Sequence, residues 1–145
     1  MYTFTTKWAD FDPNKHMRHS AYNDYAAEAR IRFFGQHSID MRFFSANQLG
    51  PILFKEETTF LREIYSGEDI KVSVELQGVS TKGERWKIRH KIIKANGDTA
   101  AQIEVYGAWI SYETRKLTTP PTTIMQLFNA IDKTDDYKPI PLKNE

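Results

Sequence analysis

The first third of the chain shows two different spacings of hydrophobic residues. Aromatic and β-branched residues alternate from Tyr2 to Trp8, which is typical of a half-buried strand. From Tyr22 to Phe33, apolar residues recur every three or four positions, which indicates one face of an α-helix. We therefore expect a strand, a turn and a long helix, with Ser20 or His19 capping the helix and Gly35 ending it.

The rest of the chain alternates apolar and polar residues in four runs that are separated by short turns. Asn96-Gly97, between the last two runs, is the strongest hairpin signal in the sequence. A short helix is expected before these runs and another after them. The expected strands are 52–65, 70–77, 86–92 and 101–112, and the expected short helices are 38–47 and 122–131.

These elements predict a single α+β domain over residues 1–132. Five antiparallel strands would form a sheet with one apolar face, and the Tyr22–Phe34 helix is the one long helix that can cover it. We expect the sheet to wrap around this central helix. Both edges of such a sheet are open, so pairing into a homodimer or homotetramer is expected. Residues 133–145 are polar and interrupted by proline, which predicts a loose C-terminal tail.

Composition narrows the range of partners. Of the 145 residues, 40% are hydrophobic and 27% are charged, and the formal net charge is only +1. A balanced domain of this kind has no overall attraction for nucleic acid or for an anionic membrane. The chain has no cysteine, which excludes disulfides and thiolate nucleophiles. It also lacks an apolar run of about 18 residues and the features of a secretion signal, so we expect a cytoplasmic protein.

Candidate chemistry is concentrated in the turn before the long helix, where Asp10, Asp12, His16 and His19 lie close together in the sequence. A helix N-terminus presents unpaired N–H groups and the positive end of a dipole, so carboxylates and imidazoles beside it are candidates for catalysis. The plainer interpretation is that Asp12-Pro13-Asn14 only shapes the turn. The four histidines form no recognisable pattern of metal ligands, and we expect no metal.

The same turn carries a resemblance to a known family. The segment Asp10-Phe-Asp12-Pro-Asn-Lys-His16-Met-Arg-His19-Ser-Ala-Tyr22, with Tyr25 and Glu28-Ala-Arg30 after it, resembles the opening signature of hotdog-fold acyl-CoA thioesterases. The 4-hydroxybenzoyl-CoA thioesterase type is the most similar branch. The segment from Phe60 to Asp69 resembles that family's strand-and-turn segment, and the resemblance extends over residues 3–115. Many family members have glycine at the position of Lys15, so this chain departs from the family there.

The resemblance implies a hotdog fold with the active site at a dimer interface. Asp12 matches the essential carboxylate, which acts as a nucleophile or as a general base for water. Backbone N–H groups near His19 and Ser20 match the site that polarises the thioester carbonyl, where they would stabilise the developing oxyanion. The implied reaction is hydrolysis of an acyl-CoA, or of a thioester of acyl carrier protein, to an acid and a free thiol. No cofactor is implied beyond the coenzyme A of the substrate.

Substrate contacts are expected from the motif and from the later strands. Coenzyme A carries phosphates, which call for basic residues near the entrance of the site. The candidates are His16, Tyr22 and Tyr25 from the motif, and Arg62, Lys87 and Arg89 from the strands. Lys87 and Arg89 share one strand face, which could equally be the solvated face of an antiparallel sheet.

Two other functions are compatible with the sequence. A hotdog hydratase or dehydratase for enoyl thioesters would pair an acidic residue with a histidine, and Asp12-Pro-Asn-Lys-His16 loosely resembles its motif. A hotdog protein could also bind an acyl group or a partner without catalysis. The position of Asp12 separates these functions: a carboxylate that faces a cavity at the helix N-terminus favours the thioesterase, and one that caps the helix and faces solvent favours the binding protein.

Overall fold

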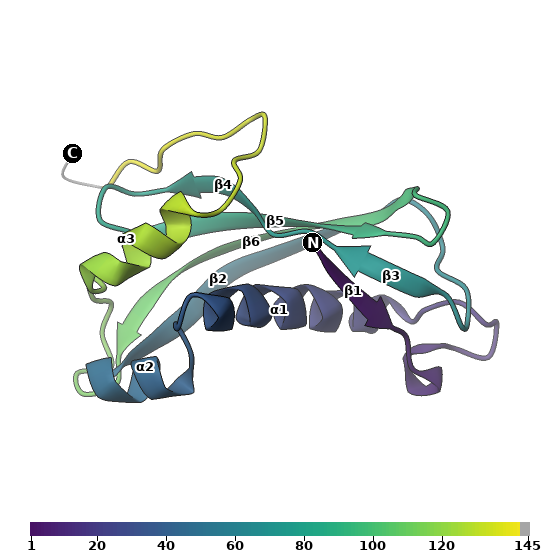
Figure 1. Ribbon diagram of the computed structural model, residues 1–145, viewed down its shortest axis with the longest axis horizontal. Coiled ribbons are helices and arrows are strands. Elements are labelled where there is room, and N and C mark those ends of the chain that lie inside the picture. Colours follow the sequence, from purple (N-terminus) through teal and green to yellow (C-terminus); the bar gives the residue numbers. More distant parts are fainter. Residues whose placement is uncertain (143–145) are drawn as a thin grey trace.

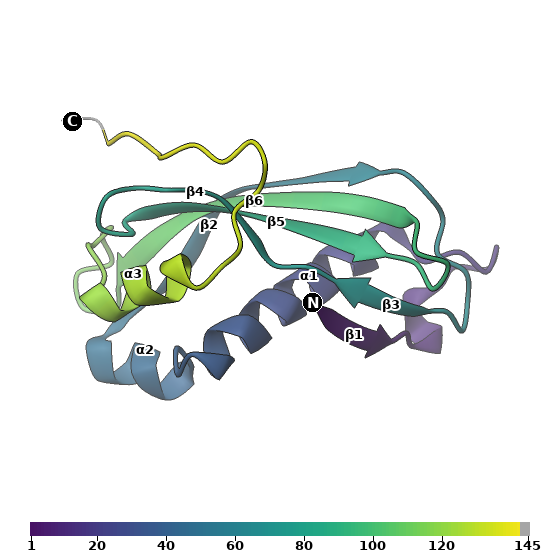
Figure 2. The ribbon, with the colours of Figure 1, turned by 45° about the horizontal axis from the view of Figure 1, so that its top comes forward.

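One bent sheet lies over one long helix in the computed structural model, which describes residues 1–142 (Figure 1). Two short helices, α2 and α3, lie together at one end of the molecule, and β1 lies toward the other end (Figures 1 and 2). In chain order the elements are β1 (Tyr2–Thr5), η1 (Trp8–Asp10), α1 (His19–Gln36), α2 (Met41–Asn47), β2 (Leu49–Phe60), β3 (Asp69–Val72), β4 (Glu75–Val79), β5 (Arg85–Ile93), β6 (Thr99–Ser111) and α3 (Thr122–Asn129).

The strands form one antiparallel sheet in the order β1-β3-β5-β6-β2, with β4 also paired to β5. β3 and β4 lie on the same side of β5 in a continuous register, since Val72 lies opposite Ile92 and Glu75 lies opposite Arg89. They are therefore the single strand that the sequence predicts over 70–77, interrupted at residues 73 and 74. The predicted five-stranded antiparallel arrangement is confirmed with this division, although the strand predicted over 52–65 begins at Leu49 and ends at Phe60.

The helix α1 packs closely against the concave face of the sheet. Ala21, Ala26 and Ala29 have no exposed surface, and their small side chains let the helix backbone approach the strands. Larger side chains at these positions would clash in a densely packed interior. At the end of the molecule that carries α2, α3 covers the core with Phe128, whose ring lies 6.5 Å from that of Trp109. The predicted central helix is confirmed.

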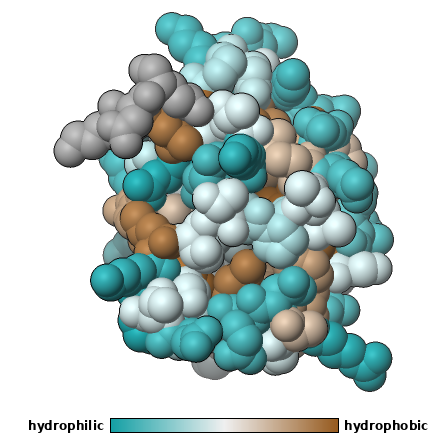
Figure 3. Space-filling view, turned by 90° about the vertical axis from the view of Figure 1, so that its left-hand side faces the viewer, coloured by the Kyte–Doolittle hydropathy of each residue, from teal (hydrophilic) through white to brown (hydrophobic). Residues whose placement is uncertain are grey.

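The outer surface is mixed in character. At the end that carries α2 and α3, hydrophobic residues are scattered among hydrophilic ones (Figure 3). Within residues 1–142, no helix is both long enough and apolar enough to cross a membrane.

The first strand is shorter than the sequence predicts. β1 ends at Thr5, and the amide of Asp10 donates to the carbonyl of Lys7 (N···O 3.0 Å), which turns the chain into η1. Trp8 is 89% exposed in this turn, although the alternation predicts it on the buried face. Asp10 is buried instead, so a tertiary contact overrides the strand pattern.

The ends of α1 also differ from the predicted signals. Arg18 is the N-cap residue and its side chain makes no capping hydrogen bond. Ser20 and His19, the predicted caps, lie in the first turn of the helix, so that prediction is wrong. Gly35 lies inside the helix, which continues to Gln36, and the chain turns at Ser38 with a φ of 64°.

The segment after α3 is held against the sheet. The amide of Leu76 donates to the carbonyl of Asp132 (2.8 Å), and the amide of Ile140 donates to the carbonyl of Val79 (3.0 Å). These bonds satisfy the otherwise open edge of β4, and Ile140 is buried there. The sequence predicts a loose tail here, whereas residues 132–140 are tied to β4. Residues 143–145 of that tail lie outside the described residues.

Arg30 and His90 form a buried polar pair between α1 and β5. His90 Nδ1 lies 2.8 Å from the carbonyl oxygen of Ser73, so this nitrogen carries the hydrogen. Nε2 then accepts a hydrogen bond from Arg30 Nη1 at 3.0 Å. Burial, and then the charge of Arg30, lower the pKa of His90 from 6.5 to about 3. His90 is therefore a neutral core residue with both ring nitrogens satisfied.

This pair predicts a loss of stability in mild acid. The unfolded chain takes up a proton at the ordinary pKa of histidine, 6.5, whereas the folded chain excludes it down to about pH 3. The unfolded state then binds more protons, so the free energy of unfolding falls as the pH falls, by up to about 1.4 kcal/mol per pH unit well below 6.5. Urea unfolding at pH 7 and pH 5 measures this slope. His90→Gln should reduce it and His37→Gln, on the surface, should not; equal slopes in wild type and His90→Gln would contradict the assignment.

Candidate active site

The turn before α1 is organised by one oxygen of Asp12. Oδ1 accepts hydrogen bonds from the amides of Asn14 (2.9 Å) and His16 (3.2 Å). The backbone of Asp12 also donates to the carbonyl of His16 (2.9 Å). No described residue makes a hydrogen bond with the second oxygen, Oδ2. One oxygen of this carboxylate therefore fixes its orientation while the other stays available.

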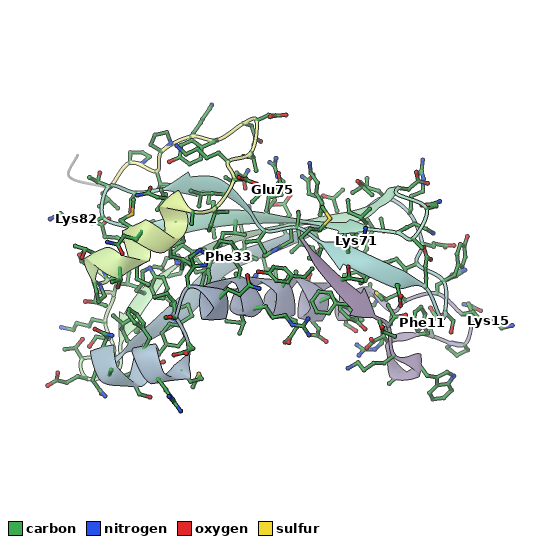
Figure 4. The ribbon with its side chains drawn as sticks, viewed as in Figure 1. Phe11, Lys15, Phe33, Lys71, Glu75 and Lys82 are labelled. Atoms are coloured by element: carbon green, nitrogen blue, oxygen red, sulfur yellow. The ribbon has the colours of Figure 1, made fainter. Side chains whose placement is uncertain are left out.

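Lys15 occupies the position where the resembled family often has glycine. Its φ is 65°, in the left-handed region that glycine adopts without cost and that other residues rarely adopt. Lys15 lies at the same end of the molecule as Phe11, and Lys82 lies at the opposite end (Figure 4). The departure from the family therefore leaves the backbone of the turn in the conformation that glycine would favour.

Asp10 and Tyr25 anchor the turn to α1. The side chain of Asp10 is 4% exposed, and its Oδ2 accepts a short hydrogen bond from the Tyr25 hydroxyl. Burial, and then this bond to the carboxylate, raise the pKa of Tyr25 to about 12. Arg18 supports the same carboxylate, with Nη2 3.6 Å from Oδ1. Tyr25, a predicted substrate contact, is thus committed to a structural hydrogen bond.

Removing the Tyr25 hydroxyl should destabilise the fold. Tyr25→Phe leaves a buried carboxylate without its main donor, and we expect the free energy of unfolding to fall by about 2 kcal/mol. Tyr2→Phe is the matched control, because the Tyr2 hydroxyl bonds Gln36 on the surface (2.6 Å); it should cost about 0.5 kcal/mol or less. Urea unfolding of both variants is the measurement. Similar losses in the two variants would show that the bond to Asp10 has no special weight.

A cavity of about 570 Å³ opens beside the turn. One wall is the turn with the start of α1, and the other is the segment that follows β2. It brings together five of the predicted site residues: Asp12, His16, His19, Tyr22 and Arg62. The other residues that line it are Met17, Phe60, Leu61, Glu63 and Tyr65.

Glu63 and two aromatic residues of this cavity were not predicted as site residues. His16 Nε2 lies 3.2 Å from a carboxylate oxygen of Glu63, and the His16 ring meets the Tyr65 ring edge-on at 5.5 Å. Phe60 makes a similar contact with Tyr22 at 5.1 Å. These residues belong to the Phe60–Asp69 segment, which resembles the family's strand-and-turn segment. Spacing along the sequence does not show that this segment lies against the Asp12 turn.

The start of α1 lies beside the same cavity. The first amides of a helix have no partner within the helix, and here the N-cap residue Arg18 offers no side-chain acceptor. Its guanidinium donates instead to the Ser20 hydroxyl (2.6 Å). His19 lines the cavity, whereas the exposed Ser20 side chain does not. Asp12 therefore faces a cavity at the helix N-terminus and does not cap the helix.

The structure does not bring Lys87 and Arg89 to this cavity. Lys87 lines a separate hollow of about 360 Å³ that shares no residue with the Asp12 cavity. Arg89 is held by Asp136 (2.7 Å) and Glu104 (3.1 Å). The hydrogen bond to Asp136 raises the pKa of Arg89 and lowers that of Asp136 to about 2. Both basic residues lie on the outer face of the sheet, away from the Asp12 cavity of the same chain.

No group of three or more histidine, aspartate or glutamate side chains suited to a metal ion occurs within residues 1–142. The charged and polar groups that line the cavity include two carboxylates, two imidazoles and one guanidinium, beside the start of α1.

Comparison with known proteins adds to this geometry. The family model described as the thioesterase-like superfamily matches residues 6–128. No curated protein sequence matches the chain. A hypothetical protein from Staphylococcus aureus, solved in complex with CoA, is 21% identical with a TM-score of 0.85, and the match covers 94% of this chain and 87% of that one.

Two solved structures named as thioesterases are also similar. The 1,4-dihydroxy-2-naphthoyl-CoA thioesterase from Synechocystis is 15% identical with a TM-score of 0.80, over 92% of this chain and 97% of that one. A gentisyl-coenzyme A thioesterase is 16% identical with a TM-score of 0.76, over 88% of this chain and 98% of that one. At these identities the structural likeness establishes the shared fold.

Proposed function

Because the chain belongs to the thioesterase-like superfamily and has its hotdog fold, we propose that it hydrolyses an acyl-CoA thioester to a carboxylic acid and free CoA. The proposal rests mainly on one observation, that two groups needed for thioester hydrolysis lie at the same cavity. A carboxylate with an uncommitted oxygen, Asp12, lines the same space as the uncapped start of α1 at His19. These are the two groups that attack on a thioester carbonyl requires.

The reaction follows from the roles of these groups. Asp12 either attacks the carbonyl carbon and forms an anhydride, or takes a proton from the water that attacks it. In both routes the carbonyl oxygen gains negative charge, which the backbone amides near His19 and Ser20 stabilise. Loss of one such donor typically lowers the rate by ~10²–10³. CoA departs as the thiolate. In the first route water then hydrolyses the anhydride, which releases the carboxylic acid and restores the Asp12 carboxylate; in the second route the attacking water gives the acid directly, and the proton that Asp12 took is available to the thiolate.

The lining of the cavity favours an aromatic acyl group. Tyr22, Phe60 and Tyr65 present rings to the cavity, and flat rings pack favourably edge-on against one another. The two similar thioesterases are named for dihydroxynaphthoyl and gentisyl groups. Arg62 is the cavity residue that can meet a phosphate or a second anionic group. Aromatic acyl-CoAs are therefore the first class to test.

We expect Asp12→Asn to abolish turnover. Asparagine keeps the oxygen that the amides of Asn14 and His16 require, so the turn should persist, but it has neither the nucleophile nor the base. The kcat for thiol release should fall by at least ~10²-fold. The measurement is thiol release from aromatic, short-chain and long-chain acyl-CoAs by both proteins.

Asp24→Asn is the matched control, because Asp24 is an exposed aspartate on α1. Its activity should equal that of the wild type. Full activity in Asp12→Asn would refute the role of Asp12. Failure of the wild type to release thiol from any acyl-CoA would contradict the substrate class and direct the test to thioesters of acyl carrier protein.

A hydratase is the second candidate, and one observation favours it. The His16–Glu63 pair lines the same cavity as Asp12, so an imidazole and carboxylates are available for acid–base chemistry. Enoyl-CoAs in the same panel distinguish this reaction, because hydration removes the conjugated double bond without releasing thiol.

The proposal includes a homodimer formed through β2. β2 is the last strand of the sheet, so one of its edges has no strand partner within residues 1–142. It has 12 residues and carries exposed Phe54 and Phe60. Such an edge favours pairing with a second copy. Because Phe60 also lines the Asp12 cavity, the second chain would complete the wall of the site.

Light scattering tests the assembly. We expect at least twice the chain mass of 16.9 kDa at micromolar concentration. A mass equal to one chain at every concentration, in a preparation that hydrolyses acyl-CoA, would show that one chain holds a complete site.

A further inference from the structure

The wall of the cavity opposite Asp12 is an irregular segment, Leu61–Glu68, which we call the wall loop. It supplies Leu61, Arg62, Glu63 and Tyr65 to the cavity. At its start the amides of Leu61 and Arg62 both donate to the carbonyl of Ala100 (2.8 and 2.9 Å). Beyond this point no strand of the described residues holds the loop, so its position depends on other contacts.

The wall loop is joined to the turn that carries Asp12. The amide of Met17 donates to the carbonyl of Ile64 (2.8 Å), and the amide of Ser66 donates to the carbonyl of Lys15 (3.1 Å). His16 and Tyr65 lie opposite each other in the same bridge. These bonds join the wall loop to the turn, whereas the orientation of the Asp12 carboxylate is set within the turn by the amides of Asn14 and His16.

One lysine that does not line the cavity contacts the wall loop. Lys94 lies at the start of the β5–β6 hairpin, and its side chain is only 9% exposed. Its ammonium donates a short hydrogen bond to the carbonyl of Glu63 and lies 4.5 Å from the centre of the Tyr65 ring. It also lies 3.7 Å from a carboxylate oxygen of Glu68, which is 13% exposed.

Glu68 also connects the wall loop to the β5–β6 hairpin. Its carboxylate accepts hydrogen bonds from the amide of Tyr65 in the wall loop and from the amide of Ala95 in the hairpin, both at 3.0 Å. The hairpin itself is a firm base, because the amide of Lys94 bonds the carbonyl of Asp98 (2.8 Å) around the Asn96-Gly97 turn. The pair therefore connects this hairpin to the wall loop, which is anchored elsewhere by the buried Ile64 and by its hydrogen bonds to the turn.

The charge on Lys94 favours one position of the wall loop. An ammonium removed from water is costly unless it is paired and hydrogen-bonded. The described partners of this ammonium, namely Glu63, Tyr65 and Glu68, all belong to the wall loop, so movement of the loop would leave a buried charge without partners. An apolar side chain of similar length would fill the space without setting a position.

We infer that Lys94 and Glu68 are positioning residues that hold the wall loop at the distance from Asp12 that substrate binding requires. The inference rests on the proposed function for its effect on catalysis, but the restraint on the loop is independent of it. Neither side chain lines the cavity, so the pair acts through Glu63 and Tyr65, which do.

Kinetics of Lys94→Met tests the catalytic half. Methionine keeps most of the alkyl length and removes the ammonium, so the wall loop loses its restraint while Asp12 and the helix start remain. We expect KM for the best acyl-CoA to rise about 10-fold, with kcat changed less than about 3-fold. Lys94→Arg should recover most of the loss, and Lys71→Met, which changes an exposed lysine of β3, should have no effect. An unchanged KM in folded Lys94→Met would overturn the inference.

Amide hydrogen exchange tests the structural half whatever the activity. In Lys94→Met and in Glu68→Gln, exchange at Met17 and Ser66 should accelerate about 10-fold, because their acceptors lie across the junction with the wall loop. Exchange at Ile103, in the core of β6, should stay at the wild-type rate. Acceleration at all three amides would indicate general destabilisation, and unchanged exchange at Met17 and Ser66 would show no restraint; either result overturns the inference. Absence of hydrolysis in the wild type, with the local acceleration intact, would refute the proposed function and retain the restraint.

Discussion

The close packing of α1 against the sheet is the contact on which the rest of the molecule depends. Three fully buried alanines bring the helix backbone near the strands, and the sheet bends over it (Figure 2). This packing fixes the helix N-terminus in the fold. The chain that enters the helix must then turn sharply, and the buried Asp10–Tyr25 bond holds that turn to the helix. The cavity is the space left between this turn and the end of β2.

The same carboxylate serves both structure and proposed chemistry. One oxygen of Asp12 closes the turn through two amides, which sets the direction of the other. A carboxylate held in this way needs little reorganisation during a reaction, as preorganised catalysis requires. The opposite wall is held differently, by the buried Lys94–Glu68 pair. The candidate site is thus built from two restrained walls rather than from one rigid element.

The sequence predicted what depends on periodicity and local turn chemistry. The central helix, the antiparallel strands and the Asn96-Gly97 hairpin were all predictable, because each leaves a pattern within a short window. The hotdog family was identified from the Asp10–Tyr22 segment. The exposure of Trp8, the tail along β4 and the contacts of Tyr25, Glu63 and Lys94 were missed, because each depends on a partner that is distant in sequence. Lys87 and Arg89 were placed by strand alternation alone, which says nothing of distance to Asp12.

The most direct test of the central claim is a crystal structure of the Asp12→Asn protein with an acyl-CoA that it does not cleave. We expect the thioester carbonyl carbon to lie beside residue 12, with its oxygen directed at the backbone amides near His19 and Ser20. An acyl-CoA whose thioester lies elsewhere, such as the hollow lined by Lys87 and Tyr106, would contradict it.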